Sequence, residues 1–515
     1  MKNITIYKRN GFIAVLVLAV VMAGAFSCKK GTLDINGTNP NSPQTVPPAN
    51  ALTAALAGTA NLMYSAAVGG NQDVLNNWMG YWTQSGGYTP NNTYVLYQLT
   101  SGTFSGNWDV AYNNLSNYNA MINSVNGNPA LANYKAVGMI MTAFVYQRIV
   151  DLYAKAPYTG ALAPNAQFSY KYDDGSTIYK AITIKIDSAV ALIAASGSAT
   201  DIGSADVMFG GDMSMWKKFA NTLKLKILMR QTQQSAGGSL GDAGVKAALT
   251  GYSQADFLGA GEDASINPGY SNAADNQENP LFLDVVANAS NAPGINQKYY
   301  RANAYAVGFY KDHNDPRLTS FYYPNDAGNV VGRVYGSQNG NESNSLISAI
   351  SAFGKNSSGA YHNASVSSPI IPATESLFLQ AEAIQRGYIT GDLTATYNSA
   401  VAESFRLVGA TGADTYTAQS DALTNIGQAV GGGKLTTIIT QKWAALNGID
   451  PLESFSDYRR LGIPAIPVSI YPGVTVSHIP YRLPYPTSEL NFNGGNVPDG
   501  GTGTQSLTSK IFWMP

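Results

Sequence analysis

A single cysteine, Cys28, occurs in the 515 residues of the chain, so no disulfide can form within it. Histidine is almost as scarce: His313, His362 and His478 are the only three, and neither HExxH nor CxxC is present. The sequence therefore lacks the spacing of the common zinc sites, and it predicts no metal and no cofactor. Only 12% of the residues are charged, with a formal net charge of −1. Because phosphate binding needs clustered Lys and Arg, this composition argues against a nucleic-acid-binding surface.

Motifs for catalysis are missing as well. The chain contains no GxSxG and no GxxxxGK[ST], and the Gly-rich stretch GQAVGGGK at 427–434 has the wrong spacing for a phosphate-binding loop. Glycoside hydrolysis needs two facing carboxylates. Glu375 and Glu382 could share one helix face, but Glu382 precedes Arg386 by four residues, which favours an ordinary helical ion pair. We therefore predict that the protein is not an enzyme.

The one long apolar run lies near the N-terminus. Residues 12–25 are apolar and follow Lys2, Lys8 and Arg9, an arrangement typical of a secretion signal and too short for a membrane-spanning helix of about 20 residues. The stretch FSCKK that follows places Cys28 where a bacterial lipobox has its lipidated cysteine, although Ala25 and Phe26 depart from the usual lipobox residues. The sequence thus predicts a lipoprotein signal peptide at 1–27 and lipidation of Cys28. Ordinary signal cleavage beside an incidental cysteine is the alternative.

Beyond Cys28, residues 28–49 are polar and rich in Asn, Pro and Gly, which indicates a tether, and residues 50–515 form one predicted domain. Apolar residues recur at helical spacing in most of this domain. The predicted helices cover about 50–67, 107–125, 131–154, 176–195, 214–234, 374–386, 393–408, 434–447 and 453–461. Neighbouring pairs among them suggest helical hairpins of the tetratricopeptide-like kind, joined by long loops at 68–106, 236–300 and 322–368. Seven prolines at 462–498 predict an extended or turned tail.

Several motifs in the second half of the chain resemble those of one family. PATESLFLQAEAIQRGYITGDLTATYNSAV, IITQKWAALNGIDPLESFSDYRRLGIP and RLPYPTSELNFN are similar, in this order, to segments of SusD/RagB-type outer-membrane lipoproteins. FANTLKLKILMR, VDLYAKAPYTGAL and NDPRL agree earlier in the chain, and the branch with YPTSE near the C-terminus is the nearest. In the family, an acidic cluster after the lipidated cysteine is associated with surface display. This chain has Lys29, Lys30 and Gly31 there instead.

The resemblance implies a mostly α fold, the SusD-like arrangement of tetratricopeptide-like helical hairpins with long loops and minor β-structure. It implies a non-catalytic lipoprotein, anchored in the cell outer membrane and facing the exterior. Such a protein captures oligosaccharide or another nutrient and delivers it to a TonB-dependent transporter of the SusC type. A surface glycoside hydrolase and a structural adhesin without a small ligand are the alternatives.

Most residues of the shared motifs are expected to build the fold. Trp443 is in helical phase with apolar neighbours, which places it in the core. Arg459, Arg460, Arg482 and Glu489 suit forked hydrogen bonds that hold extended segments against helices. Asp315, before Pro316, is a turn former.

Tyrosine is abundant, with 32 Tyr against 17 Phe, and two stretches concentrate aromatic rings. Residues 76–97, NNWMGYWTQSGGYTPNNTYVLY, carry Trp78, Tyr81, Trp82 and Tyr88 among Gly, Pro and Asn. Flat sugar rings stack on such faces while amides and hydroxyls bond the sugar hydroxyls, so we predict a binding shelf here. Packing of Trp78 and Trp82 on the buried face of a short helix is the alternative. The second stretch, QKYYRANAY at 297–305, adds Tyr299, Tyr300 and Asn303 to the predicted ligand-binding residues.

Overall fold

A computed structural model describes residues 46–64, 71–163, 169–233, 237–338, 346–498 and 505–515 of the chain. The chain divides into two units, Met1–Asn50 and Ala51–Pro515, and the features discussed below lie in the second. The predicted signal peptide, Cys28 and most of the predicted tether lie outside the described residues. Within the described residues, no helix combines the length and the apolar character needed to cross a membrane.

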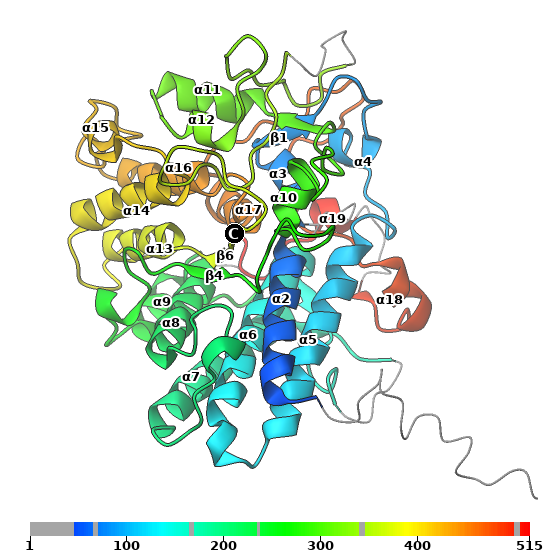
Figure 1. The fold of residues 1–515 in the computed structure, drawn as a ribbon, viewed down its shortest axis with the longest axis vertical. Helices are drawn as coiled ribbons and strands as arrows, with labels where there is room; N and C mark the ends of the chain where they lie inside the picture. Colours follow the sequence, from blue (N-terminus) through cyan, green and yellow to red (C-terminus); the bar gives the residue numbers. More distant parts are fainter. Residues whose placement is uncertain (1–45, 65–70, 164–168, 234–236, 339–345, 499–504) are drawn as a thin grey trace, which may run out of the picture. The chain divides into compact units, whose positions relative to one another are not determined.

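The fold is mostly helical, as the sequence predicted, and the long helices begin and end close to their expected positions (Figure 1). They are α2 (Pro48–Tyr64), α5 (Ser105–Val125), α6 (Ala132–Tyr153), α7 (Gly175–Ala195), α8 (Met213–Arg230), α13 (Ala373–Gln385), α14 (Leu393–Leu407), α16 (Gly433–Ala445) and α17 (Pro451–Leu461). Each follows an apolar repeat of three or four residues, which is the strongest structural signal that a sequence carries.

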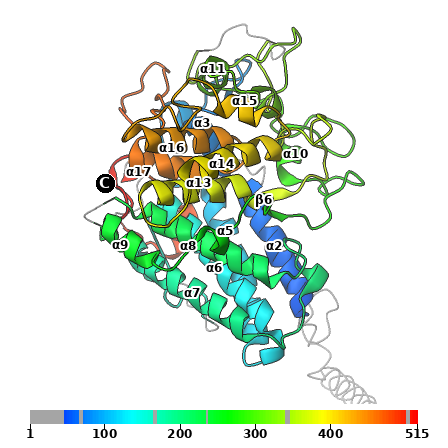
Figure 2. The same ribbon diagram turned by 90° about the vertical axis from the view of Figure 1, so that its left-hand side faces the viewer.

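Helices α5 to α8 pack against one another in chain order, and Figure 2 shows them as neighbouring rods beside α2. Helix α6 lies in the middle of this layer, with apolar residues on all sides and nearly every side chain buried. Its close contact with α5 requires a glycine: a Cβ on Gly138 would lie 2.8 Å from a side-chain carbon of Ile122 and 2.9 Å from one of Met121.

The second half of the chain builds another helical group from α13, α14, α16 and α17. Phe378, Tyr397, Val401 and Ile438 form the centre of its apolar core. Helix α17 also contacts α6 and α8, and it therefore joins this group to the first helical layer.

The segments that the sequence analysis treated as long loops contain short elements. Small two-stranded antiparallel sheets pair β1 (Trp82–Gln84) with β5 (Tyr300–Ala302), β2 (Lys155–Ala156) with β3 (Asp173–Asp174), and β4 (Ala264–Ile266) with β6 (Ser368–Ile371). The short helices are α3 (Asn71–Trp78), α4 (Asn92–Val95), α9 (Gly241–Ala248), α10 (Pro280–Val285), α11 (Ala304–Asp312), α12 (Leu318–Phe321), α15 (Ala413–Thr417), α18 (Thr487–Phe492) and α19 (Gln505–Thr508).

Helix α18 corrects the expectation that residues 462–498 contain no helix. Its segment TSELNF is free of proline, and Pro486 stands at its N-cap, where a missing N–H has no cost because the first helical donors lack partners anyway. The proline-rich part before it is extended or turned, as predicted.

The many tyrosines have a structural role that phenylalanine could not fill. Their hydroxyls donate to backbone carbonyls of other segments, at 2.6 to 2.9 Å, in Tyr64–Ile449, Tyr81–Trp443, Tyr112–Pro157, Tyr310–Ala444, Tyr322–Tyr81, Tyr335–Tyr94, Tyr397–Thr424 and Tyr485–Tyr153. Trp443 and Ala444 lie in the last turn of α16, and Tyr153 ends α6. The carbonyls of Ala444 and Tyr153 lie at helix ends, where donors within the helix run out, and these hydroxyls satisfy them. The Trp443 carbonyl also accepts from the Leu446 N–H at 3.1 Å.

Charged side chains gather in the interior, where α6, α8, α13, α16 and α17 meet. Glu453 is central: it accepts hydrogen bonds or ion pairs from Lys226 (2.9 Å), Arg230 (2.8 Å) and Lys442. The other members are Arg148, Asp151, Glu375, Glu382, Asp450, Asp457 and Arg460, and their side chains are at most 3% exposed. We call this set the buried ionic network.

Charge pairing within the network sets the protonation of its acids. Burial alone would raise the pKa of Glu453, but Arg230, Lys226 and Lys442 hold it well below its ordinary value. Likewise, Arg460 outweighs burial and holds the pKa of Glu382 at about 2. At Glu375 burial prevails, and the pKa rises to about 7 in spite of Lys226. The network therefore rests mainly on ionised carboxylates that buried cations neutralise.

Replacing Glu453 by Gln should lower the free energy of unfolding by about 3–5 kcal/mol, because three buried cations lose a shared counter-charge. Urea unfolding followed by circular dichroism measures this. Asp174→Asn is the matched control: its partner Lys155 is 2.8 Å away, but the two side chains are 65% and 47% exposed. The control should cost less than about 1 kcal/mol, and equal losses in the two variants would contradict a dominant buried network.

Candidate functional site

The two aromatic stretches singled out in the sequence meet in the structure through the sheet of β1 and β5. Trp82 pairs with Ala302, Thr83 with Arg301, and Gln84 with Tyr300. Residues 76–97 and 297–305 therefore lie side by side although they are far apart in the chain. The sheet brings together the seven residues proposed from the sequence, but it does not present all of them to solvent.

Trp78, Tyr81 and Trp82 are at most 1% exposed. Both tryptophans are packed, but only Trp78 belongs to a short helix, α3, since Trp82 begins β1. The ring of Tyr81 stacks on Trp443 at 5.2 Å between centroids, and its hydroxyl donates to the Trp443 carbonyl at 2.6 Å. Trp78 packs against Phe455 at 5.8 Å. These rings offer no open face to a ligand in this conformation.

Tyr300 and Asn303 are also buried, at 3% and 2% exposure. The Tyr300 ring lies 5.4 Å from that of Trp82. The Asn303 amide donates to the Trp82 carbonyl at 3.0 Å, and its oxygen caps α11 by accepting from the Tyr305 N–H at 2.9 Å. Both side chains fix the backbone next to the sheet.

Tyr88 and Tyr299 remain at the surface and contact each other edge to face, with ring centroids 5.2 Å apart. Tyr88 is 37% exposed, and Tyr299 is half-buried. The loop that carries Tyr88 is held by Gln84, whose side chain donates to the Thr89 carbonyl at 2.5 Å and accepts from the Asn91 N–H at 2.9 Å. We call Tyr88 and Tyr299 the surface tyrosine pair. Their ligand-binding role stays a prediction.

A buried arginine belongs to β5, close to this pair. Arg301 is 3% exposed, and its guanidinium donates to the carbonyls of Gln297 (2.5 Å) and Tyr300 (2.8 Å). In the part of the chain that the structure describes, it forms no ion pair with a carboxylate. Burial lowers the pKa of Arg301, and the nearby Tyr88 hydroxyl only partly offsets this. Arg301 therefore places a buried positive charge near Tyr88.

An apolar cavity of about 290 Å³ adjoins the buried part of this region, lined by Gly80, Asn303, Tyr305 and Tyr335 among others. Gly80 has φ +72°, and a Cβ there would lie 2.8 Å from the Tyr305 ring. The cavity therefore depends on a glycine at this turn.

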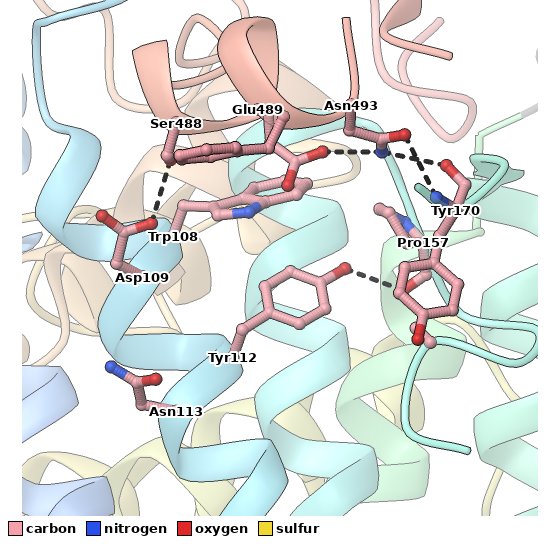
Figure 3. Close-up of a pocket in the computed structure, with 11 residues that line it drawn as sticks. Trp108, Asp109, Tyr112, Asn113, Pro157, Tyr170, Ser488, Glu489 and Asn493 are labelled. Atoms are coloured by element: carbon pink, nitrogen blue, oxygen red, sulfur yellow. Dashed lines mark hydrogen bonds between the residues drawn. The ribbon is translucent and has the colours of Figure 1, made fainter. Parts of the chain in front are cut away.

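A second concave region lies between α5 and α18, and the sequence analysis did not propose it (Figure 3). Trp108, Asp109 and Tyr112 project into it from α5, and Glu489 and Asn493 from α18. Its volume is about 520 Å³, within the range of about 300–1,000 Å³ usual for small-molecule sites. We call it the α5–α18 groove. YPTSELNFN was noted as a family motif, but nothing in the sequence indicated that it faces Trp108.

Three carboxylates of the buried ionic network, Glu375, Asp450 and Glu453, come within 4.8 Å of one another. Such a group could bind a metal ion, but here the Lys226 ammonium lies 2.8 Å from Glu375, 3.2 Å from Asp450 and 2.9 Å from Glu453. The lysine supplies the positive charge that a cation would otherwise bring.

Among the residues expected to build the fold, Trp443 is 2% exposed and Arg459, Arg460 and Arg482 are buried. Arg459 holds an extended segment as expected, donating to the carbonyls of Asp151 (2.7 Å) and Tyr481 (2.8 Å). Arg460 instead joins two helices through its fork on Glu382, at 2.6 and 2.7 Å. The expected pair of Glu382 with Arg386 is present at 2.8 Å. The Asp315 carboxylate accepts hydrogen bonds from the Arg317 guanidinium within its turn.

The arrangement of helices, small sheets and loops can now be compared with known proteins. The sequence model of the SusD-like family, described as "Starch-binding associating with outer membrane", matches residues 40–486. The chain belongs to the SusD-like family. A comparison with curated proteins found no match.

Solved structures share the fold of this SusD-like protein over nearly the whole chain. A SusD homolog from Bacteroides fragilis is 19% identical, with a TM-score of 0.72 over 91% of this chain and 99% of the homolog. A SusD-like protein from Bacteroides thetaiotaomicron is 22% identical, with a TM-score of 0.71 over 91% and 99%. A chitin-binding SusD homolog from Flavobacterium johnsoniae is 22% identical, with a TM-score of 0.69 over 90% and 98%.

Proposed function

We propose that this SusD-like protein is a non-catalytic binding lipoprotein of the outer membrane, which captures oligosaccharide and delivers it to a TonB-dependent transporter of the SusC type. The surface tyrosine pair carries the ligand part of the proposal. Tyr88 and Tyr299 are the members of the predicted shelf that reach the surface, and they do so beside a loop of Gly, Thr and Asn. Family membership and the chitin-binding relative from Flavobacterium johnsoniae support a carbohydrate as the ligand.

The geometry of the pair suits a sugar ring. Two aromatic rings set edge to face offer surfaces at an angle, so a ring stacked on one can contact the edge of the other. Gln84 restrains the loop before any ligand arrives, and little conformational entropy is then lost on binding. These features suit the binding of a sugar and involve no group that reacts with it.

The two alternatives predict different behaviour. A surface glycoside hydrolase would release shortened products from a bound glycan, whereas an adhesin would bind no oligosaccharide at all. The released products, or their absence, therefore separate the hydrolase from the binding protein.

Binding of oligosaccharides tests the ligand. Chitin-type and starch-type oligosaccharides should be screened on a glycan array, and the best ligand titrated by calorimetry. Tyr88→Ala should weaken binding about 5- to 30-fold, the equivalent of about 1–2 kcal/mol for one aromatic contact, with the melting temperature nearly unchanged.

Tyr81→Phe is the matched control for this titration, because it removes a buried hydroxyl that bonds the Trp443 carbonyl and Ser454. We expect it to lower stability by about 1–3 kcal/mol and to leave affinity intact. Unchanged affinity in Tyr88→Ala would remove the surface tyrosine pair from the site, and shortened glycan products would replace the proposal by a hydrolase.

The lipid anchor is tested by Cys28→Ala in cells. Several acyl chains, at about 0.8 kcal/mol per buried methylene, would supply nearly all of the membrane affinity. The variant should move from the membrane to the soluble fraction, and labelled palmitate should mark only the wild type. If neither the fractionation nor the labelling changes, ordinary signal cleavage is the better interpretation of residues 1–27.

The transporter partnership predicts a complex. The formal net charge of −1 offers little steering by charge, so the interface is expected to be large and of mixed polarity. Pulldown of a tagged chain in mild detergent, from cells that express both proteins, should recover a β-barrel transporter. Repeated recovery of the lipoprotein alone would count against the partnership, and a chain carrying Cys28→Ala shows whether the complex needs the anchor.

A further inference from the structure

The α5–α18 groove has the composition of a binding site, and it uses none of the residues of the surface tyrosine pair. Its walls come from α5, from the turn after α6 that holds Pro157 and Ala161, from Tyr170, and from α18 (Figure 3). These segments are distant in sequence and meet only in the folded unit. The groove is large enough for a small oligosaccharide segment, given the usual size of ligand sites.

Aromatic side chains form part of its lining and are held in place from below. Trp108 is the floor; it packs at 4.9 Å on Tyr112 and at 5.9 Å on Tyr485, measured between ring centroids. Tyr112 is fixed by its hydrogen bond to the Pro157 carbonyl at 2.7 Å. Phe492, in contrast, is 77% exposed at the edge of the groove. A phenylalanine this exposed beside a concave aromatic surface marks a place where a ligand could bury it.

Two carboxylates face the same space, and each has one oxygen committed to the protein. One oxygen of Asp109 accepts from the Ser488 hydroxyl at 3.1 Å. One oxygen of Glu489 accepts from Tyr172 at 2.7 Å and from the Asn493 amide at 2.9 Å. The second oxygen of each has no hydrogen-bond donor within the described part of the chain. Both acids therefore hold a fixed acceptor that is available to a ligand.

Asn493 makes the wall rigid. Its amide donates to the Tyr170 carbonyl at 2.9 Å, and its oxygen accepts from the Tyr170 N–H at 3.1 Å. Burial, reinforced by Glu489, raises the pKa of Tyr172, so this tyrosine stays a donor to Glu489. The acceptors are thus held in position before a ligand binds.

The charge of the groove is one-sided. Asp109 and Glu489 are the charged residues of its lining, which contains no Lys or Arg. A neighbouring cavity that shares Tyr170 adds Lys171 and Asp173, one charge of each sign. The net charge of the two linings together stays negative, whereas the buried charge near the surface tyrosine pair, on Arg301, is positive. Such a groove attracts hydrogen-bond donors and positive charge and repels anions.

We propose that the α5–α18 groove is a second glycan-binding site, selective for sugars that carry hydroxyl and amino groups and against acidic sugars. Asp109 and Glu489 accept hydrogen bonds from the ligand, and Tyr170 and Phe492 cover its apolar faces. The choice of a sugar as ligand rests on the proposed function, whereas the selection by charge follows from the lining. A long glycan that reaches both sites would gain affinity through the raised effective concentration of its second end.

The test uses three probes of one length, titrated by calorimetry into the soluble chain with Tyr88→Ala and Tyr299→Ala, which together remove both rings of the surface tyrosine pair. The probes are a glucosamine tetramer (cationic), chitotetraose (neutral) and tetragalacturonate (anionic). We expect the cationic probe to bind best and the anionic probe not at all. The double variant Asp109→Asn with Phe492→Ala should weaken the cationic probe at least about tenfold, through lost charge and lost aromatic area.

Val430→Ala, which trims an apolar side chain that is 83% exposed elsewhere on the chain, is the matched control and should change nothing. Glu489→Gln keeps the shape of the wall and should abolish the preference for the cationic probe while retaining chitotetraose. If Tyr88→Ala with Tyr299→Ala eliminates all binding, the groove proposal fails and the proposed function stands. If no probe binds the unmodified chain, the groove proposal fails, and the glycan array alone decides the proposed function. Equal binding of tetragalacturonate in the groove would overturn the selectivity.

Discussion

The shared position of the Lys226 ammonium, among Glu375, Asp450 and Glu453, is the interaction on which the helical frame depends. These groups come from three separate parts of the chain, and none could be buried alone, because an isolated ion loses far more hydration energy than a helix end or a neighbouring dipole restores. Helix α17 contributes Asp450 at its N-cap and Glu453 in its first turn, where the helix dipole also favours negative charge. These ion pairs consequently hold the two helical groups together.

A chain with only 12% charged residues thus places a substantial part of its acids and bases in the interior, where they neutralise one another. Tyrosine hydroxyls then pair with carbonyls at the ends of α6 and α16. Ion pairs hold the helices together, and tyrosine hydroxyls bond the carbonyls where helices and loops meet.

The sequence predicted the long helices well, because segments such as those of α6 and α14 repeat apolar residues over four or more turns. It failed for α18 and for the short sheets, since one or two turns, or three residues of strand, carry too little periodicity. At the site, residue type located the aromatic stretches, but whether a ring is exposed, as in Tyr88, or buried, as in Tyr81, depends on β5 and α16 from remote parts of the chain. The α5–α18 groove was missed for the same reason, because its two walls are far apart in sequence.

The pairing of β1 with β5 has a consequence for when the surface tyrosine pair can form. Strand β1 ends at Gln84, and its partner begins at Tyr300, so the surface tyrosine pair cannot form before the chain has been synthesised past Tyr300. A shorter fragment would carry Tyr88 without Tyr299 beside it. Formation of the surface tyrosine pair is thereby linked to synthesis of more than half of the polypeptide.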